Sequence, residues 1–382
     1  MSVKSPKGIE LFAGCGGLST GFLDAGLCVA AGFELDRRAV DAYSYNHAYR
    51  GSHGFAADLG VAKGQELLAR AGIDHVDFVI GGPPCQPFSI VGKRRGAEDS
   101  RSALIGHFVR IVGELKPQAF LWENVPNLAV AGADMLEQAK AELRDQGFVV
   151  DHIVVSAADF GVPQNRKRLV VMGMKGVTSV QFPDATFGVP NQPYRTSAEA
   201  IDDLPDAGEF GENGIFNHEP TLHSADMLKR LAALEPGKRE KGSFHDRLHP
   251  QRPSYTLRAG SGNFSPLRPV HYKYDRVITV RESARLQGFS DDFVWPDRIP
   301  RLQQYRQVGN AVPPPMAAAF ARAMAAQMGW PLNPEKFAGD PALREAANVL
   351  TDDERKSRRL SRMRGASLGK LVRSRELVGL AG

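Results

Sequence analysis

Cysteine is scarce in this chain: only Cys15, Cys28 and Cys85 occur among its 382 residues. Three thiols cannot all pair, so at least one is free, and no pair has the spacing of a metal site. This composition excludes a disulfide scaffold and favours a reducing compartment. We also expect no metal ion, because the sequence contains no obvious cluster of ligand residues.

Long apolar runs are absent as well. No stretch of the sequence is long and apolar enough to span a bilayer. Residues Met1 to Lys7 are polar and lack the apolar core of a signal peptide. We therefore expect a cytoplasmic protein that is not attached to a membrane.

The net positive charge of the chain comes from one end. From Thr351 to Gly382 there are 9 Lys and Arg against 4 Asp and Glu, which accounts for the whole net charge of +5. A helix of basic character is predicted over Asp352 to Arg375, either in contact with nucleic-acid phosphates or simply solvated. Any nucleic-acid site in the body must rest on local patches instead of global charge.

A Gly-x-Gly-x-x-Gly fingerprint is missing, although the order of elements at the start of the chain is suggestive. Gly8 to Phe12 is predicted to be a strand, and a glycine-rich turn then leads into a helix. A second strand ends in Glu34, which is placed to bind ribose hydroxyls, and Asp58 follows a third. This pattern favours an adenosyl ligand without a pyrophosphate over a dinucleotide; the alternative is a tight turn beside an exposed acid.

What the sequence does contain is an unusual stretch, Gly81 to Ser89, with two glycines and three prolines around Cys85. It follows an apolar run, Val76 to Ile80, that predicts a buried strand. Glycine and proline end any regular element, so Cys85 is expected on a stiff loop at a strand end. Such a frame suits a nucleophile, which needs a fixed position. The alternative is a turn with an inert cysteine.

Further charged groups follow strand ends. Glu123 and Asn124 come after a predicted strand, Gln118 to Trp122, and lie beside the Cys85 loop if the two strands are neighbours. Three cations, Arg166 to Arg168, precede another strand. A basic segment from Ile90 to Ser102 is expected to be a mobile loop that contacts phosphates, although a solvated charged loop is the usual reading.

The sequence pattern changes between about residues 182 and 269, where the hydrophobic periodicity of helices and strands is rare. This region is predicted to be a loop-rich insert whose mix of arginine, tyrosine and histidine can contact base edges and phosphates. Val277 to Phe289 then predicts a strand followed by a helix. Gln307 to Pro314 is expected to end a loop and open a helix that reaches about Met328.

Together the motifs resemble those of the DNA (cytosine-5) methyltransferases of the bacterial restriction-modification type, over about residues 8–330. The motifs concerned, in the order of that family, are Phe12–Gly17, Glu34, Asp58, Pro84–Gln86, Glu123–Val125, Gln164–Arg168, Arg281–Phe289 and Gln307–Val312. The resemblance implies an α/β fold with a Rossmann-like, mostly parallel sheet typical of S-adenosylmethionine-dependent methyltransferases. It implies a catalytic and cofactor-binding domain from residues 1–182 and 270–330, a target-recognition domain at 183–269 and a basic C-terminal extension at 331–382.

The resemblance also assigns roles to individual positions. The catalytic set would be Cys85, Glu123, Asn124, Arg166 and Arg168. S-adenosylmethionine would be held by Phe12, Gly14, Gly16, Gly17, Leu18, Glu34, Leu35, Asp58, Leu59, Pro83, Leu104, Asn310 and Val312. DNA would be contacted by Gln86, Ser89, Lys93, Arg101 and Arg258.

The implied reaction places a methyl group on carbon 5 of a cytosine flipped out of double-stranded DNA. Cys85 would add to carbon 6, while Glu123 protonates the ring and Arg168 holds both the cytosine carbonyl and Glu123. We expect a monomer that works on nucleoid DNA, with a restriction endonuclease acting separately. The alternatives are a transfer-RNA cytosine-5 methyltransferase and a non-catalytic DNA-binding regulator.

Overall fold

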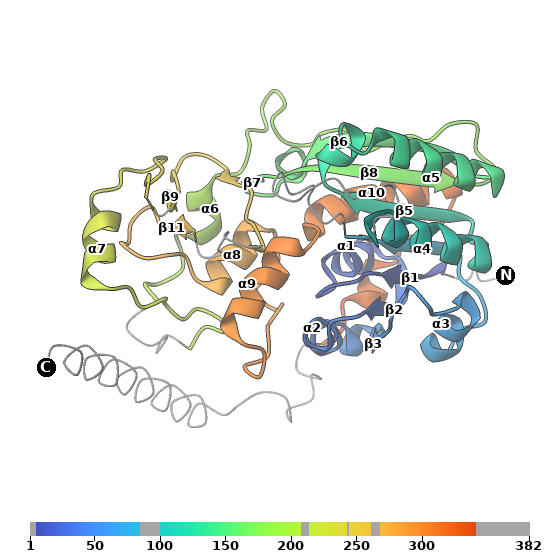
Figure 1. The fold of residues 1–382 in the computed structure, drawn as a ribbon, viewed down its shortest axis with the longest axis horizontal. Helices are drawn as coiled ribbons and strands as arrows, with labels where there is room; N and C mark the ends of the chain where they lie inside the picture. The colour runs from blue at the N-terminus through green and yellow to red at the C-terminus, as the bar shows by residue number, and fades with distance from the viewer. Residues whose placement is uncertain (1–4, 85–99, 208–213, 243, 261–267, 341–382) are drawn as a thin grey trace, which may run out of the picture.

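The structure is a computed structural model that describes residues 5–84, 100–207, 214–242, 244–260 and 268–340 (Figure 1). Its centre is a seven-stranded sheet. Across the sheet the strands are β3 (His53–Ala56), β2 (Cys28–Glu34), β1 (Lys7–Leu11), β4 (Phe78–Gly81), β5 (Ala119–Asn124), β8 (Lys167–Met174) and β6 (Val149–Ser156). Only β8 runs antiparallel to its neighbours in this sheet. The predicted α/β fold with a mostly parallel sheet is confirmed.

Helices cover both faces of the sheet, and each face has its own apolar core. One face carries α1 (Gly17–Ala25) and α10 (Pro314–Met328), and the other carries α3 (Gly64–Ala71), α4 (Ser100–Leu115) and α5 (Ala133–Asp145). Figure 1 shows α10 (orange) among the first elements of the chain (blue), where Phe320 shares a core with Phe22. None of the helices in the described ranges is long and apolar enough to cross a membrane.

Residues 197–310 form most of a second part of the molecule, on the left of Figure 1. Its helices are α6 (Ser197–Ile201), α7 (Ala225–Ala232), α8 (Val280–Leu286) and α9 (Arg301–Asn310). Ala42 of α2 (Arg37–His47), from the first part, shares an apolar cluster with residues of α6, α8 and α9. Its strands are two residues long: β9 (Asp246–Arg247), β10 (Ser254–Tyr255) and β11 (Pro269–Val270), and β10 pairs with β7 (Gln164–Asn165). Single-turn 3-10 helices are η1 (Ala48–Arg50), η2 (Pro126–Ala129), η3 (Ala157–Phe160) and η4 (Pro334–Phe337). The loop-rich texture fits the sequence, and the domain boundaries stay a prediction.

Two local predictions are wrong. Val277 makes only an isolated bridge to Val270, and residues 277–279 form no strand in front of α8. The apolar run was misleading because Thr279 caps the helix: its hydroxyl accepts the N–H of Glu282, whose carboxylate accepts the N–H of Thr279.

The second error concerns residues 307–310, which end helix α9 and are not a loop. Gly309 suggested a turn, but its role is close approach, since a Cβ added there would lie 2.6 Å from the backbone nitrogen of Ala259. In the predicted basic loop, Ser100 to Ser102 belong to α4, and the remainder lies outside the described residues.

Candidate active site

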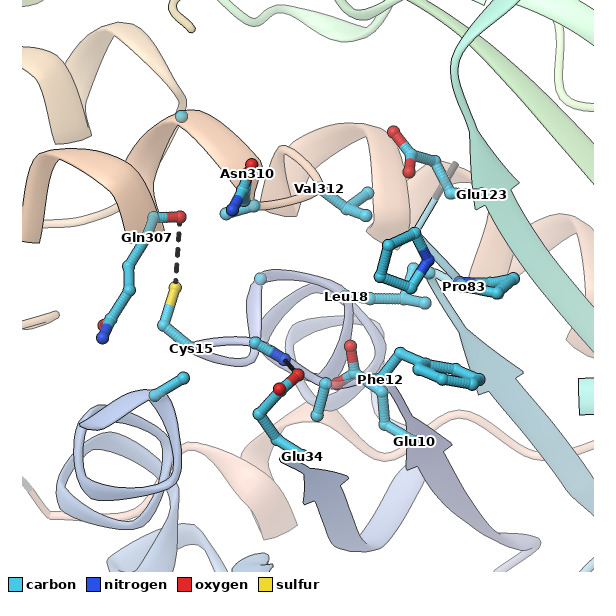
Figure 2. Close-up of a pocket in the computed structure, with 18 of the residues that line it drawn as sticks. Glu10, Phe12, Cys15, Leu18, Glu34, Pro83, Glu123, Gln307, Asn310 and Val312 are labelled. Atoms are coloured by element: carbon cyan, nitrogen blue, oxygen red, sulfur yellow. Dashed lines mark hydrogen bonds between the residues drawn. The ribbon is translucent and has the colours of Figure 1, made fainter. Parts of the chain in front are cut away.

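A cavity of about 470 Å³ opens at the carboxyl ends of the central strands. Strand β1 lies between β2 and β4, so the chain order reverses there, which is where ligands bind in open α/β sheets. In Figure 2, Glu34 and Phe12 lie on one side of this cavity, and Asn310 and Val312 lie on the other. The cavity therefore joins segments that are far apart in the sequence.

The glycine-rich turn after β1 forms one wall. Its backbone is left-handed at Phe12, Gly14 and Gly16, with φ of 55°, 55° and 91°. The N–H of Gly14 donates to Glu34 Oε2 at 3.0 Å, and Oε1 accepts the N–H groups of Leu35 and Asp36. A Cβ added to Gly14 would meet no atom within 4 Å, so the space beside it is open. The turn thus fixes one carboxylate at the edge of an open cradle.

Helix α1 approaches the start of α10 closely. A Cβ on Gly17 would lie 2.3 Å from the carbonyl oxygen of Val312, and one on Gly21 would lie 2.4 Å from that of Pro314. Only glycine fits at such a distance. The segment that carries Asn310 and Val312 is held against the glycine turn by this contact.

Glu10 is a buried acid on β1 that the sequence analysis missed. It lines the cavity floor, is 2% exposed, and accepts the backbone N–H and the hydroxyl of Ser19. The Ser19 hydroxyl also contacts the Tyr43 hydroxyl at 2.8 Å. Burial raises the pKa of Glu10 to about 8, which the hydrogen bonds from Ser19 partly oppose. The sequence signal for it was a single acid between the apolar residues Ile9 and Leu11.

At the other end of the cavity, Arg168 on β8 pairs with Glu123 on β5. Arg168 Nε is 2.7 Å from Glu123 Oε1, and the two side chains are 11% and 10% exposed. The second carboxylate oxygen faces Gly82, since a Cβ built there would lie 3.9 Å from Oε2. The pair is thus directed at the start of the Cys85 loop.

Asn124 holds that loop. Its amide nitrogen donates to the carbonyl oxygen of Pro83 at 2.9 Å, and its amide oxygen accepts the N–H of Val125. Pro83 and Pro84 line the cavity, and Cys85 follows directly in the chain but lies outside the described residues.

Arg166 is also buried at the cavity but does not contact Glu123. Its guanidinium donates to the carbonyl oxygens of Leu257 at 3.0 Å, Gly309 at 2.8 Å and Ala311 at 3.2 Å. It therefore joins the strand that carries Arg168, the second part of the molecule and the backbone on either side of Asn310.

Not every residue of the expected set lines the cavity. Those that do are Phe12, Gly14, Gly17, Leu18, Glu34, Pro83, Glu123, Asn124, Arg166, Arg168, Asn310 and Val312. Gly16, Leu35, Asp58, Leu59 and Leu104 do not line it; Leu35 is 69% exposed, and Asp58 accepts the N–H of Gly60. Lining residues to which the sequence analysis assigned no role of their own, although some lie within its motifs, are Glu10, Ala13, Cys15, Asp36, Ala39, Gly82, Pro84, Val125, Gln303, Arg306, Gln307, Gly309 and Ala311.

The predicted DNA-contacting residues are mostly outside the described ranges. Gln86, Ser89 and Lys93 fall there, and Arg101 lies in α4 at a point where side chains are not described. Arg258 lines a second cavity of about 820 Å³, together with Asn165 of β7. Among the described residues, no group of three or more His, Cys, Asp or Glu is placed to hold a metal ion.

Comparison with known proteins identifies the family. The model of the C-5 cytosine-specific DNA methylase family matches residues 6–326. The chain belongs to that family. It is an enzyme of the DNA (cytosine-5) methyltransferase class, and the resemblance read from its motifs is confirmed.

Individual relatives are similar over most of their length. The type II methyltransferase M.XorII of Xanthomonas oryzae pv. oryzae is 35% identical, covering 82% of this chain and 83% of that protein. M1.HphI of Haemophilus parahaemolyticus, also a type II methyltransferase, is 36% identical over 83% of this chain and 86% of its own. The crystal structure of a prophage-encoded E. coli protein, described as a DNA modification methyltransferase, superposes with a TM-score of 0.71 at 28% identity, covering 85% of this chain and 100% of that one.

Proposed function

We propose that this methyltransferase uses S-adenosylmethionine to modify carbon 5 of a specific cytosine in double-stranded DNA, through a transient bond to Cys85. The observation that carries the proposal is the Arg168–Glu123 pair at the mouth of the cavity, next to the loop that leads to Cys85. The same cavity contains the glycine turn and Glu34, so the groups for binding and for chemistry share one space.

The cavity suits S-adenosylmethionine in size and charge. Its volume of about 470 Å³ is in the range of small-molecule sites, and the acids Glu34 and Asp36 line it. These acids complement a ligand that carries a sulfonium and an ammonium group. When bound, the ligand supplies an electrophilic methyl group. Phe12, Gly14, Glu34, Asn310 and Val312 would hold it.

The protein groups act on the cytosine ring. Carbon 5 of cytosine is a weak nucleophile inside a base stack, so the base must first be extruded. Addition of the Cys85 thiolate to carbon 6 breaks aromaticity and makes carbon 5 enamine-like. Glu123, in its protonated form, donates to ring nitrogen 3, and Arg168 orients that carboxyl. Carbon 5 would then take up the methyl group, after which loss of its proton, return of the nitrogen 3 proton to Glu123 and expulsion of Cys85 would restore the ring.

Sequence selection is assigned to the loop-rich region at residues 183–269, between the catalytic segments 1–182 and 270–330. Its 820 Å³ cavity adjoins the active site, because Asn165 lines the one and Arg166 lines the other. The type II relatives support a role as the modification enzyme of a restriction-modification system. A cytoplasmic monomer, acting on the chromosome beside a separate endonuclease, completes the proposal.

The test measures methyl incorporation from labelled S-adenosylmethionine into duplex DNA, with transfer RNA as a parallel substrate. Cys85→Ser is expected to abolish transfer while leaving DNA and cofactor affinity near wild type. Wild-type protein should form a covalent complex with DNA that contains 5-fluorocytosine, and Cys85→Ser should not. Comparable turnover by the variant would remove Cys85 from the mechanism.

A further inference from the structure

A short hairpin crosses the loop-rich part of the molecule at residues 237–247, of which residue 243 is not described. The N–H of Gly237 donates to the carbonyl oxygen of Arg247, and the N–H of Arg247 donates to that of Lys238. Arg239 and Asp246 face each other across the hairpin and form a two-bonded ion pair, with Nε to Oδ1 at 2.5 Å and Nη2 to Oδ2 at 3.1 Å. These contacts hold the open end of the hairpin in place.

Phe244 lies at the tip of this hairpin and has an unusual backbone conformation. Its N–H donates to the carbonyl oxygen of Glu240 at 3.0 Å, and its φ is 59°. A bulky residue rarely adopts a left-handed backbone, and such strain persists where a function maintains it. The ring is also 50% exposed, so burial does not explain why a large aromatic occupies the position.

The surroundings of the ring are cationic. The Arg268 guanidinium lies over the Phe244 ring, 5.3 Å from its centroid. Both residues line the 820 Å³ cavity. The cationic side chains around this cavity are Lys238, Arg239, Arg247, Arg252, Arg258 and Arg268, of which Arg239 pairs with Asp246 and Arg247 with Asp275. The combination of an exposed aromatic face with a basic groove is typical of sites that stack a base and hold the phosphates beside it.

Resting on the proposed function, we infer that Phe244 stacks on a nucleobase of bound duplex DNA. Its ring enters the base stack beside the 820 Å³ cavity. The hairpin presents the ring to solvent at the edge of a cavity that adjoins the catalytic one through Asn165 and Arg166. An apolar wedge at this place helps to unstack a short region of DNA. Because every base has an aromatic face, the contact contributes affinity and distortion more than sequence choice.

The experiment uses the full chain and two substitutions at this position. Phe244→Gly removes the ring and at the same time relieves the left-handed backbone, so it should not lower the melting temperature. Phe244→Trp keeps a stacking face. Leu222→Ala is the matched control, since Leu222 is an apolar residue of the same region, is 69% exposed, and does not line the cavity. Bisulfite sequencing of DNA methylated by the wild-type protein first gives the recognised site, from which a short synthetic duplex is made.

Fluorescence anisotropy with that duplex should show about tenfold to hundredfold weaker binding by Phe244→Gly. Phe244→Trp and Leu222→Ala should remain within about threefold of wild type. The salt dependence of binding should not change, because no phosphate contact is lost. Duplexes carrying 5-iodouracil at single positions of the site should cross-link to Phe244 on irradiation.

Equal affinity of Phe244→Gly and wild type would overturn the inference, and so would a lower salt slope, which would assign the effect to Arg268 and the phosphates. These results leave the proposed function in place as long as the wild-type protein methylates duplex DNA. A wild-type protein that methylates no duplex DNA would remove the proposed function and the inference with it.

Discussion

Arg168 Nε and Glu123 Oε1 lie 2.7 Å apart, on neighbouring antiparallel strands. The two side chains are almost buried, so the pair is little screened by solvent and its geometry is fixed. Glu123 Oε1 is thereby paired with Arg168, and Oε2 faces Gly82 at the start of the Cys85 loop. We therefore propose that the guanidinium leaves Oε2 available to the substrate.

Replacing Arg168 tests this orientation. Arg168→Met should lower the single-turnover rate of methyl transfer by about 10²-fold or more, because the carboxyl loses its fixed partner. Arg168→Lys keeps the charge without the planar fork and should recover only part of the rate. Arg144→Met, at a half-exposed arginine on α5, is the control and should be unaffected. An unchanged rate constant in Arg168→Met would contradict the orienting role.

Arg166→Met should weaken the binding of S-adenosylmethionine. Three carbonyl oxygens, of Leu257, Gly309 and Ala311, lose their donor, and the backbone around Asn310 is no longer fixed. We expect the affinity for S-adenosylmethionine, measured by calorimetry, to fall about tenfold or more. Arg168→Met should leave that affinity near wild type, so the two substitutions should have distinguishable effects. Identical cofactor affinities in both variants would show that the carbonyl contacts do not shape the cavity.

The contact between α1 and α10 can be tested with one methyl group. Gly21→Ala brings a Cβ to 2.4 Å from the Pro314 carbonyl oxygen, and overpacking of this kind costs about 1–3 kcal/mol of unfolding free energy. Gly106→Ala in α4 meets no atom within 4 Å and should be neutral or stabilising by up to about 1 kcal/mol. Urea denaturation of both variants gives the comparison. Equal stability of the two would mean that the helices can separate freely.

Glu10 makes stability depend on pH. Its pKa is about 8 in the folded chain against an ordinary value of 4.5, so between these values the folded protein holds the extra proton. The stabilising contribution is fully present below pH 4.5 and is lost as pH rises towards 8. Compared with wild type, Glu10→Gln should gain about 1.4 kcal/mol of unfolding free energy per pH unit between pH 6 and 7.5. Urea denaturation across that range measures this difference. If the unfolding free energies of wild type and Glu10→Gln changed in parallel with pH, the raised pKa of Glu10 would be ruled out.

Local chemistry made much of this fold predictable. The turn after β1 follows from its glycines, and the adjacency of β4 and β5 follows from the preference for short, ordered connections. Glu123 was placed beside the Cys85 loop on that ground alone. The strand-helix order and the return of α10 to the first helix also follow from pattern and resemblance.

What the sequence did not reveal depends on contacts between distant segments. The Cys15 thiol contacts the carbonyl oxygen of Gln307, 292 positions away, and no local pattern predicts such a neighbour. Gly309 looked like a loop residue because no local pattern shows that the backbone of Ala259 passes beside it. Arg166 and Arg168 are indistinguishable by composition, and only their partners show that one holds backbone and the other a carboxyl.

The proposed cofactor cavity takes its floor from residues 10–18 and its opposite wall from residues 303–312. During synthesis on the ribosome the floor is therefore made early, and the space cannot close until the opposite wall has followed. We expect a product truncated before residue 303, which lacks that wall, not to bind the ligand of the cavity.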